Sequence, residues 1–277
     1  MARSIITALL LAWSGLALAA SPKAVRDQVE ASMLVNGEIA VDVAGGVAGY
    51  SFDRSEKLPE YVRTFLEQNI AGWRFEPMLV DGRPVASRNR MGLLLVARPT
   101  GDTTFDMELR NTSFHPIAKA GRDPQAAAMD PPSYPKEAAA AGVSGTVYLL
   151  LKIGADGNVA EAMAEQVNLH VAASEKAMKQ WRGVLARNAL VKARQWKFLP
   201  PTDGSQGDDG SWSVRVPVAY SFEPAARRYG QWQAYIPGPR ERAPWVTDDV
   251  APDALADGGV YPVGGTGGLR LLDRTGG

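Results

Sequence analysis

One pattern of elements occurs twice in this chain of 277 residues. Each occurrence contains Val-x-Gly, a hydrophobic strand, a turn, a helix, Trp-x-Phe and a final apolar strand. The two Val-x-Gly segments begin at Val35 and Val143, 108 residues apart, whereas Trp73 and Trp196 lie 123 residues apart. The second copy has therefore gained fifteen residues before its tryptophan, which a longer helix or loop must absorb. This spacing is too large for a solenoid repeat, so the pattern predicts one small module, duplicated into two domains.

The composition narrows the classes of protein to consider. The chain has no cysteine, so neither a disulfide framework nor a lipid on a processed N-terminal cysteine is available. Its length and its 45% hydrophobic content suffice for two packed cores. Lysine plus arginine equals aspartate plus glutamate, at 30 each, which leaves no basic excess to attract nucleic acid. We therefore expect no nucleic-acid partner.

Residues 1–20 have the composition of a secretory signal peptide. One cation, Arg3, precedes an apolar run from Ile5 to Leu18, and small residues follow where a signal peptidase cleaves. The run is shorter than the roughly 20 residues that a membrane-spanning helix needs. This favours export by a cleavable signal peptide, with an uncleaved membrane anchor as the alternative.

Hydrophobic spacing predicts the elements of the first copy. Apolar residues at intervals of four predict a helix at 24–33, and alternation predicts a strand at 35–43 with a return strand at 50–52. A second helix at 59–71 and an apolar strand at 91–97 complete the copy.

The second copy is predicted in the same way. Ser133 is expected to cap a short helix that ends at Gly142, and a turn at Asp156 and Gly157 joins two strands. A helix capped by Ser174 runs to residue 194, and a half-buried strand occupies 214–222.

The predicted boundaries follow from these elements. The signal peptide covers 1–20, the first domain 22–115, the second domain 131–223, and a polar, proline-bearing linker 116–130. A Pro/Gly-rich tail covers 224–277 and is either disordered or lies along the domains. No sequence motif indicates its role.

The second copy also carries a set of motif residues in a fixed order. These residues are Tyr134, Pro135, Gly142, Gly145, Asp156, Gly157, Trp196, Phe198 and Pro200. With the Val216-Pro217-Val218 strand, they make residues 131–223 resemble the TonB C-terminal domain family. The first copy, with Trp73, Phe75 and Pro77, resembles a degenerate member that lacks the Tyr-Pro element. The resemblance implies an α+β fold of two such domains, each a three-stranded antiparallel sheet packed on two helices, in the periplasm.

The resemblance further implies a partner and a mode of binding. In the family the last strand lies at a sheet edge and pairs with an extended peptide from an outer-membrane transporter. Pro217 supports an edge position independently, because proline lacks a backbone donor and is tolerated mainly on edge strands or at bulges. The expected binding edge, unpaired in the monomer, consists of Val214, Arg215, Val216, Pro217, Val218, Ala219, Tyr220 and Ser221.

The chain departs from a full energy transducer of the family. Such a transducer has an uncleaved membrane anchor and a long proline-rich spacer, whereas here a second globular copy takes the place of the spacer. The alternative function is therefore a structural or interaction protein of the cell envelope, without energy transduction. Its copies would dock through their edge strands, in one sheet or in a homodimer.

Other candidate sites have simpler structural interpretations. The Trp-x-Phe aromatics are interpreted as core residues rather than as a ligand-stacking set. Tyr134 is either a partner contact or a hydrophobic staple, and both stay open. His115 and His170 lack further ligands at metal spacing, so no metal site is expected.

Two groups of acidic residues raise the question of a calcium site or a catalytic carboxylate pair. Asp203, Asp208 and Asp209 lack the ligand alternation of a calcium loop and are interpreted as part of a solvated loop. Glu161 and Glu165 are expected on a solvent face. No catalytic motif is present, so we expect neither an enzyme nor a small-molecule cofactor; only a carboxylate cleft between the domains would favour a hydrolase.

Overall fold

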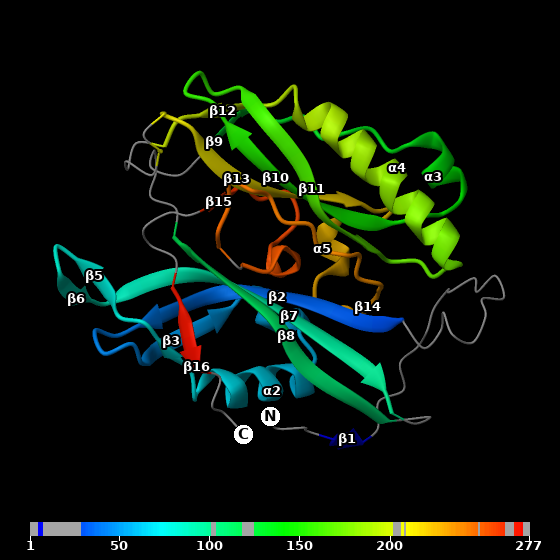
Figure 1. Ribbon diagram of the computed structural model, residues 1–277. Coiled ribbons are helices and arrows are strands. Elements are labelled where there is room, and N and C mark those ends of the chain that lie inside the picture. The colour runs from blue at the N-terminus through cyan, green and yellow to red at the C-terminus, as the bar shows by residue number, and fades with distance from the viewer. Residues whose placement is uncertain are drawn as a thin grey trace.

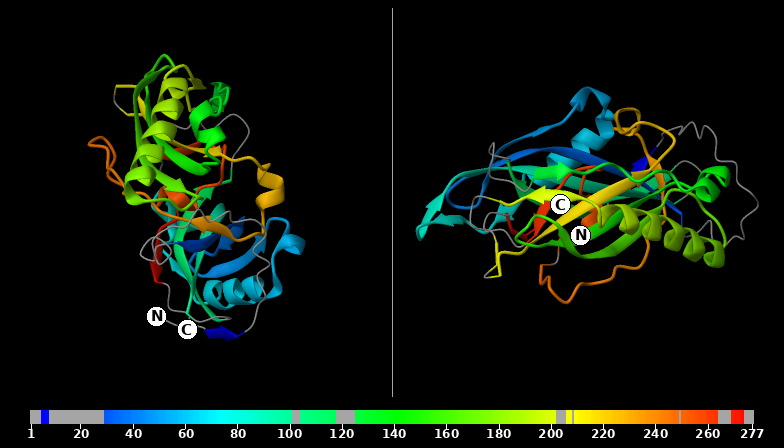
Figure 2. Two further views of the ribbon diagram at one scale, coloured as in Figure 1. Left: turned by 90° about the vertical axis from the view of Figure 1, so that its right-hand side faces the viewer. Right: turned by 90° about the horizontal axis from the view of Figure 1, so that it is seen from above.

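The computed structural model describes residues 5–7, 29–100, 104–117, 125–201, 206–207, 209–248, 250–263 and 269–273. Its two larger sheets are antiparallel, each with a helix on its outer side, and the C-terminal tail runs between them (Figures 1 and 2). We call the sheet that contains β2 the first unit and the sheet that contains β10 the second unit.

The first unit is a six-stranded sheet in the order β1-β8-β7-β2-β14, with β3 also pairing with β2. Its strands are β1 (Ile5–Thr7), β2 (Glu30–Val41), β3 (Val47–Phe52), β7 (Ser87–Pro99), β8 (Thr104–Pro116) and β14 (Gln233–Tyr235). The helix α2 (Glu60–Ile70) buries Val62, Phe65, Leu66 and Ile70 in the core of this unit. Removing such apolar area from water is the main force that holds the helix on the sheet.

The second unit is a four-stranded sheet in the order β11-β10-β13-β15. Its strands are β10 (Gly145–Ile153), β11 (Val159–Leu169), β13 (Trp212–Tyr220) and β15 (Tyr261–Val263). The helices α3 (Lys136–Ala140) and α4 (Glu175–Ala193) belong to this unit, and α4 buries Met178, Leu185 and Ala189 against the sheet. The Ser174 side chain caps α4 by accepting from the Ala177 N–H at 3.3 Å, as predicted.

Short elements complete the fold. Three pairs of short strands, of two to four residues each, are β4 (Arg74–Phe75) with β16 (Leu271–Asp273), β5 (Met78–Val80) with β6 (Arg83–Val85), and β9 (Gln125–Ala128) with β12 (Lys197–Leu199). The remaining short helices are η1 (Ser55–Lys57), α5 (Ala225–Arg228) and η2 (Pro252–Ala254). β9 lies in the segment 116–130 that was expected to be a linker, so part of this segment packs on the second unit.

One glycine in each unit holds the Trp-x-Phe segment in the same way. Gly45 and Gly157 have φ of 83° and 77°, and their carbonyls accept the N–H groups of Phe75 and Phe198 at 2.9 Å. A Cβ on either glycine would lie 2.1 Å or 2.3 Å from the carbonyl oxygen of that phenylalanine. Only glycine tolerates both the backbone conformation and this approach. The phenylalanines and the tryptophans before them are buried, which confirms their interpretation as core residues.

The second unit has fifteen more residues than the first between Val-x-Gly and the tryptophan, and they lie mainly in regular elements. α4 has 19 residues against 11 in α2, and β11 has 11 residues against 6 in β3. The expected longer helix is therefore present, and a longer return strand accompanies it.

The structure corrects the prediction of two helices in the first unit. The C-terminal part of the helix predicted at 24–33 is the start of β2, because Met33 lies opposite Leu95 of β7 and is buried in the core. A four-residue apolar interval fits either element in a short segment, and pairing with β7 decides it. Residues 24–28 and most of the predicted signal peptide lie outside the described residues, so the signal peptide stays a prediction.

The tail joins the two units. β14 pairs with the start of β2, and the next residue, Ile236, exchanges two backbone hydrogen bonds with Leu169 at the end of β11, at 3.0 and 3.1 Å. Of the two alternatives for the tail, its described residues support the one in which it lies along the domains.

Candidate functional site

β13 contains most of the residues expected to bind a partner, and one of its edges is fully paired. Its partner there is β10, from Gly145 opposite Tyr220 to Ile153 opposite Trp212. On its outer edge, β15 pairs with Ser213–Arg215. The expectation of an unpaired edge is therefore wrong at these residues. Among the described residues, no strand pairs with the outer edge beyond Arg215.

One hydrogen bond shows which residues of β13 direct their backbone N–H and C=O groups to the outer edge. The Pro217 carbonyl accepts the Gly258 N–H at 3.0 Å on the outer side. In an antiparallel ladder, the N–H and C=O of one residue point to the same side, and successive residues alternate. Ser213, Arg215 and Ala219 therefore also direct their backbone groups outward. Pro217 lies where its missing N–H would face away from β10, which explains why the sheet tolerates it.

Both faces of β13 are covered. The side chains of Val214, Val216 and Val218 lie in the core with α4, as the alternation predicted. On the opposite face Arg215 and Pro217 are buried as well, so the prediction of a half-buried strand is wrong. The covering residues belong to the tail, whose packing a local pattern does not encode.

A buried ion-pair network lies on this second face. Arg215, 3% exposed, donates from Nε to Glu165 at 2.7 Å and from Nη2 to Asp248 at 2.6 Å. Glu165, 2% exposed, also accepts from Nη2 of Arg240 at 2.8 Å. Burial opposes the charge of Arg215, but the hydrogen bonds to both carboxylates keep its pKa above the usual value. Glu165 is thus not on a solvent face as expected, whereas Glu161 is exposed.

An aromatic cluster lies beside the end of β13. The Tyr134 ring stacks on Phe222 with centroids 5.0 Å apart and meets Tyr220 edge to face at 5.5 Å. The Tyr134 hydroxyl donates to the Val143 carbonyl at 2.6 Å, and burial raises the pKa of Tyr134 to about 12. Phe222 is 59% exposed. Tyr134 thus packs on the end of β13 and on Phe222, and Phe222 offers apolar surface at the end of the edge. Whether Tyr134 is a staple or a partner contact stays a prediction.

The remaining motif residues shape turns and element ends. Pro135, rather than Ser133, is the N-cap of α3, and Gly142 ends α3 with φ of 65°. Gly145 starts β10, where a Cβ would lie 2.5 Å from a backbone oxygen of β11. The Asp156 carboxylate accepts the Asn158 N–H at 3.0 Å and orders the β10–β11 turn. Pro77 and Pro200 follow β4 and β12 in the chain.

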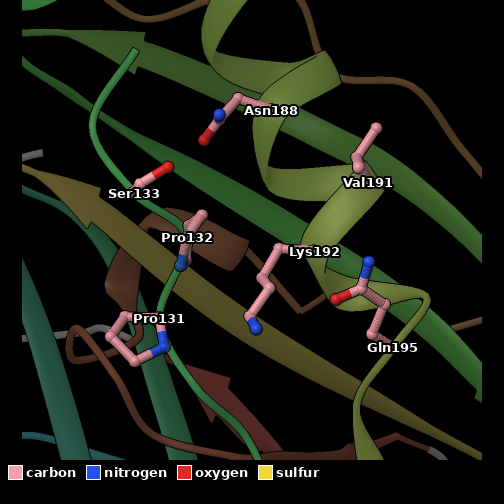
Figure 3. Close-up of a pocket in the computed structure, with 7 residues that line it drawn as sticks. All are labelled: Pro131, Pro132, Ser133, Asn188, Val191, Lys192 and Gln195. Carbon is pink, nitrogen blue, oxygen red and sulfur yellow. The ribbon is translucent and has the colours of Figure 1, made fainter. Parts of the chain in front are cut away.

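A shallow pocket of about 300 Å³ lies between α4 and the segment before α3 (Figure 3). It is lined by Pro131, Pro132, Ser133, Asn188, Val191, Lys192 and Gln195. The Asn188 Oδ1 atom also accepts a hydrogen bond from the Tyr220 hydroxyl, with the two oxygens 2.6 Å apart. This bond connects the pocket to the end of β13. The lining residues include no carboxylate and no histidine, so they do not form an acid–base pair.

The described residues contain neither a cluster of metal ligands nor a helix that could span a membrane. In the described ranges, no three or more His, Cys, Asp or Glu side chains gather as a metal site. Asp203 and Asp208 of the acidic loop lie outside those ranges. No helix of the described residues has the length and apolar character to cross a membrane.

Comparisons with known proteins give one family match. Residues 130–222 match the family described as Gram-negative bacterial TonB protein C-terminal. Over 94 residues the chain is 36% identical to the Protein TonB of Xanthomonas campestris pv. campestris, in strains B100 and ATCC 33913. The similar segment covers 34% of this chain and 36% of each relative, so the chain matches about a third of their length.

Proposed function

Because this chain belongs, through its residues 130–222, to the TonB C-terminal domain family, we propose that it is a cell-envelope protein of the TonB type. In this proposal it acts in the periplasm and is not an enzyme. It binds an extended peptide of an outer-membrane transporter by adding the peptide as a strand to the outer edge of β13.

The observation that carries this proposal is the pairing of β13 with β15. The outer edge takes an antiparallel strand of three residues and a further hydrogen bond from Gly258 to Pro217. Its backbone therefore presents the outward groups that strand addition requires. Affinity would come from backbone hydrogen bonds, and selectivity from alternate side chains of the peptide.

We propose the second unit rather than the first as the binding unit. In the first unit, β7 follows the Trp-x-Phe segment as β13 does in the second, so we infer a degenerate copy of the same module. There, β8 pairs with β7 from Asn89 to Pro99, which leaves that edge no room for a peptide. The proposed first domain covers 22–115, the proposed second domain 131–223 and the proposed tail 224–277.

The structural alternative, without energy transduction, receives less support. A continuous sheet through the two copies would need β7 to pair with β13. Instead, β7 pairs with β2 and β8, and β13 pairs with β10 and β15. A homodimer formed through β13 remains an outcome that the binding experiment detects.

The experiment titrates the isotope-labelled full chain with short peptides from the periplasmic ends of outer-membrane transporters and follows amide shifts by NMR. We expect shifts at β13 and the residues that flank it, up to Ser221. Ala219→Pro removes an outward N–H and should abolish the shifts, whereas Ala219→Val keeps this donor and should preserve them. Equal shifts in both variants, or shifts away from β13, contradict the proposal; concentration-dependent line broadening without peptide indicates the homodimer.

A further inference from the structure

We propose that the tail segment 256–263 is a built-in competitor for the outer edge of β13. In this inference, which rests on the proposed function, the segment must leave the edge before a peptide of useful length pairs with it. The tail is then an autoinhibitory element, and the chain has a closed state and an open state.

The closed state leaves almost no edge for another strand. Ser213, Arg215, Pro217 and Ala219 are the residues of β13 whose backbone groups point outward. The tail engages the first three, through Val263, Tyr261 and Gly258 respectively. Only Ala219 remains before β13 ends at Tyr220. One residue does not support an added strand, so peptide and tail exclude each other.

The rest of the tail is anchored much more firmly than β15. The hydroxyl of Ser113 in β8 donates to the Ala254 carbonyl at 2.7 Å, and Tyr235 donates to Asp253 at 2.6 Å. Asp248 and Arg240 of the tail belong to the buried network around Glu165. These contacts hold residues 235–248 and 250–254 between the two units, so the segment 256–263 starts from a fixed point beside the edge.

β15 itself has features of a strand that leaves readily. It has three residues, all of them partly exposed. Its middle residue, Pro262, lies opposite Val214, at a position where neither residue hydrogen-bonds to the other strand. The pairing thus rests on few hydrogen bonds together with the contact of the Tyr261 ring with His115, whose centroids are 4.8 Å apart. Release of 256–263 breaks these contacts, and also the ion pair of Asp257 with Arg228 at 3.0 Å and the packing of Val260 on the core of the second unit. The anchored part stays in place, and so does β16, which pairs with β4.

The consequence for affinity follows from the population of the open state. When only a fraction of molecules is open, the apparent dissociation constant equals the intrinsic constant divided by that fraction. A variant that frees the edge should therefore bind peptide at least about tenfold more tightly, and a variant that locks the tail should not bind.

Because the chain has no cysteine, two introduced cysteines can form one defined disulfide that fixes the tail to β13 and that reduction breaks again. Ser213 and Val263 lie opposite each other in the β13–β15 pair, both partly exposed. Hydrogen-bonded antiparallel pairs have Cα atoms about 5.5 Å apart, within the range for a disulfide. The double variant Ser213→Cys, Val263→Cys should lock the tail when oxidised and release the lock on reduction in the same sample.

The release variant is Tyr261→Pro, which removes an N–H that faces Arg215. Its matched control is Pro262→Ala, at the neighbouring position that does not hydrogen-bond to β13. Peptide affinity is measured on the full chain by the NMR titration above, and protected amides in β10 establish that each variant is folded.

We expect tight binding to Tyr261→Pro and wild-type binding to Pro262→Ala. The double variant should bind peptide after reduction and should not bind it when oxidised, so that its two forms are compared with each other. Wild-type shifts at β13 in the oxidised form overturn the inference but leave the proposed function intact. If Tyr261→Pro, with its tail amides exposed to exchange, binds no transporter peptide at all, the proposed function fails and the inference falls with it.

Discussion

Replacing Glu165 with glutamine tests the buried network that fixes the tail to the second unit. Glu165 accepts hydrogen bonds from Nε and Nη2 of Arg215, at 2.7 and 3.3 Å, and from Nε and Nη2 of Arg240, at 3.0 and 2.8 Å. A glutamine has one carbonyl oxygen, and its amide group would direct N–H donors at guanidinium donors. At least two charge-assisted hydrogen bonds are lost, each of about 1.5 kcal/mol or more. We therefore expect a loss of about 3 kcal/mol in the free energy of unfolding, in the range for breaking one partner out of a buried ion pair.

The assay is urea unfolding at neutral pH, together with hydrogen exchange of the tail amides at 240–248. The matched control is Glu161→Gln on the same strand, where the exposed carboxylate should change stability by no more than about 0.5 kcal/mol. In Glu165→Gln the tail amides should exchange faster than in the control. Equal stability and equal exchange in the two variants would refute the reasoning, because the network would then contribute nothing to holding the tail.

Two further predictions concern pH and a turn. Burial, and then the charge of Arg215, lowers the pKa of His115 from 6.5 to about 4, against an opposing effect of Asp248. As the pH falls, the unfolded chain takes up this proton before the folded chain does. The contribution of neutral His115 to the free energy of unfolding is therefore fully present above pH 6.5 and decreases toward pH 4, by about 2 kcal/mol at pH 5. Urea unfolding of His115→Phe should not show this decrease. In the same assay, Gly157→Ala should lower the free energy of unfolding by about 3 kcal/mol and Gly142→Ala by about 1 kcal/mol. Both glycines have positive φ, but of the two only Gly157 has a backbone oxygen within 2.3 Å of the new Cβ. Equal costs would mean that the turn relaxes.

Most central elements of both units were predictable because their signals are local. Alternation predicted β2, β10 and β13, and a helical period with a serine cap predicted α4. The turn glycine at 157 and the core role of the Trp-x-Phe aromatics also followed from residue type and spacing. The same local reasoning failed at 24–33, where a short apolar interval fits a helix and a strand equally well.

The candidate site was predictable only in part. The sequence located the strand at 214–222, with the binding edge at 214–221, and gave a reason, Pro217, for placing it at an edge. It did not indicate that a tail segment about fifty residues further along the chain pairs with that edge, nor that Glu165 is buried with two arginines. A three-residue strand with a central proline carries almost no strand signal of its own.

The amino-acid sequence by itself determined the central strands of both units, the helices α2 and α4, the turn glycine at 157 and most of the residues that fill the two cores, because these depend on side-chain periodicity and on backbone conformations that only glycine adopts readily. The tertiary structure alone decided which edges are free. Strand partners are chosen by contacts between distant segments, and here β8 covers β7 while the tail covers β13. The segment that pairs with β13 lies about fifty residues further along the chain, and no local pattern at β13 indicates this pairing.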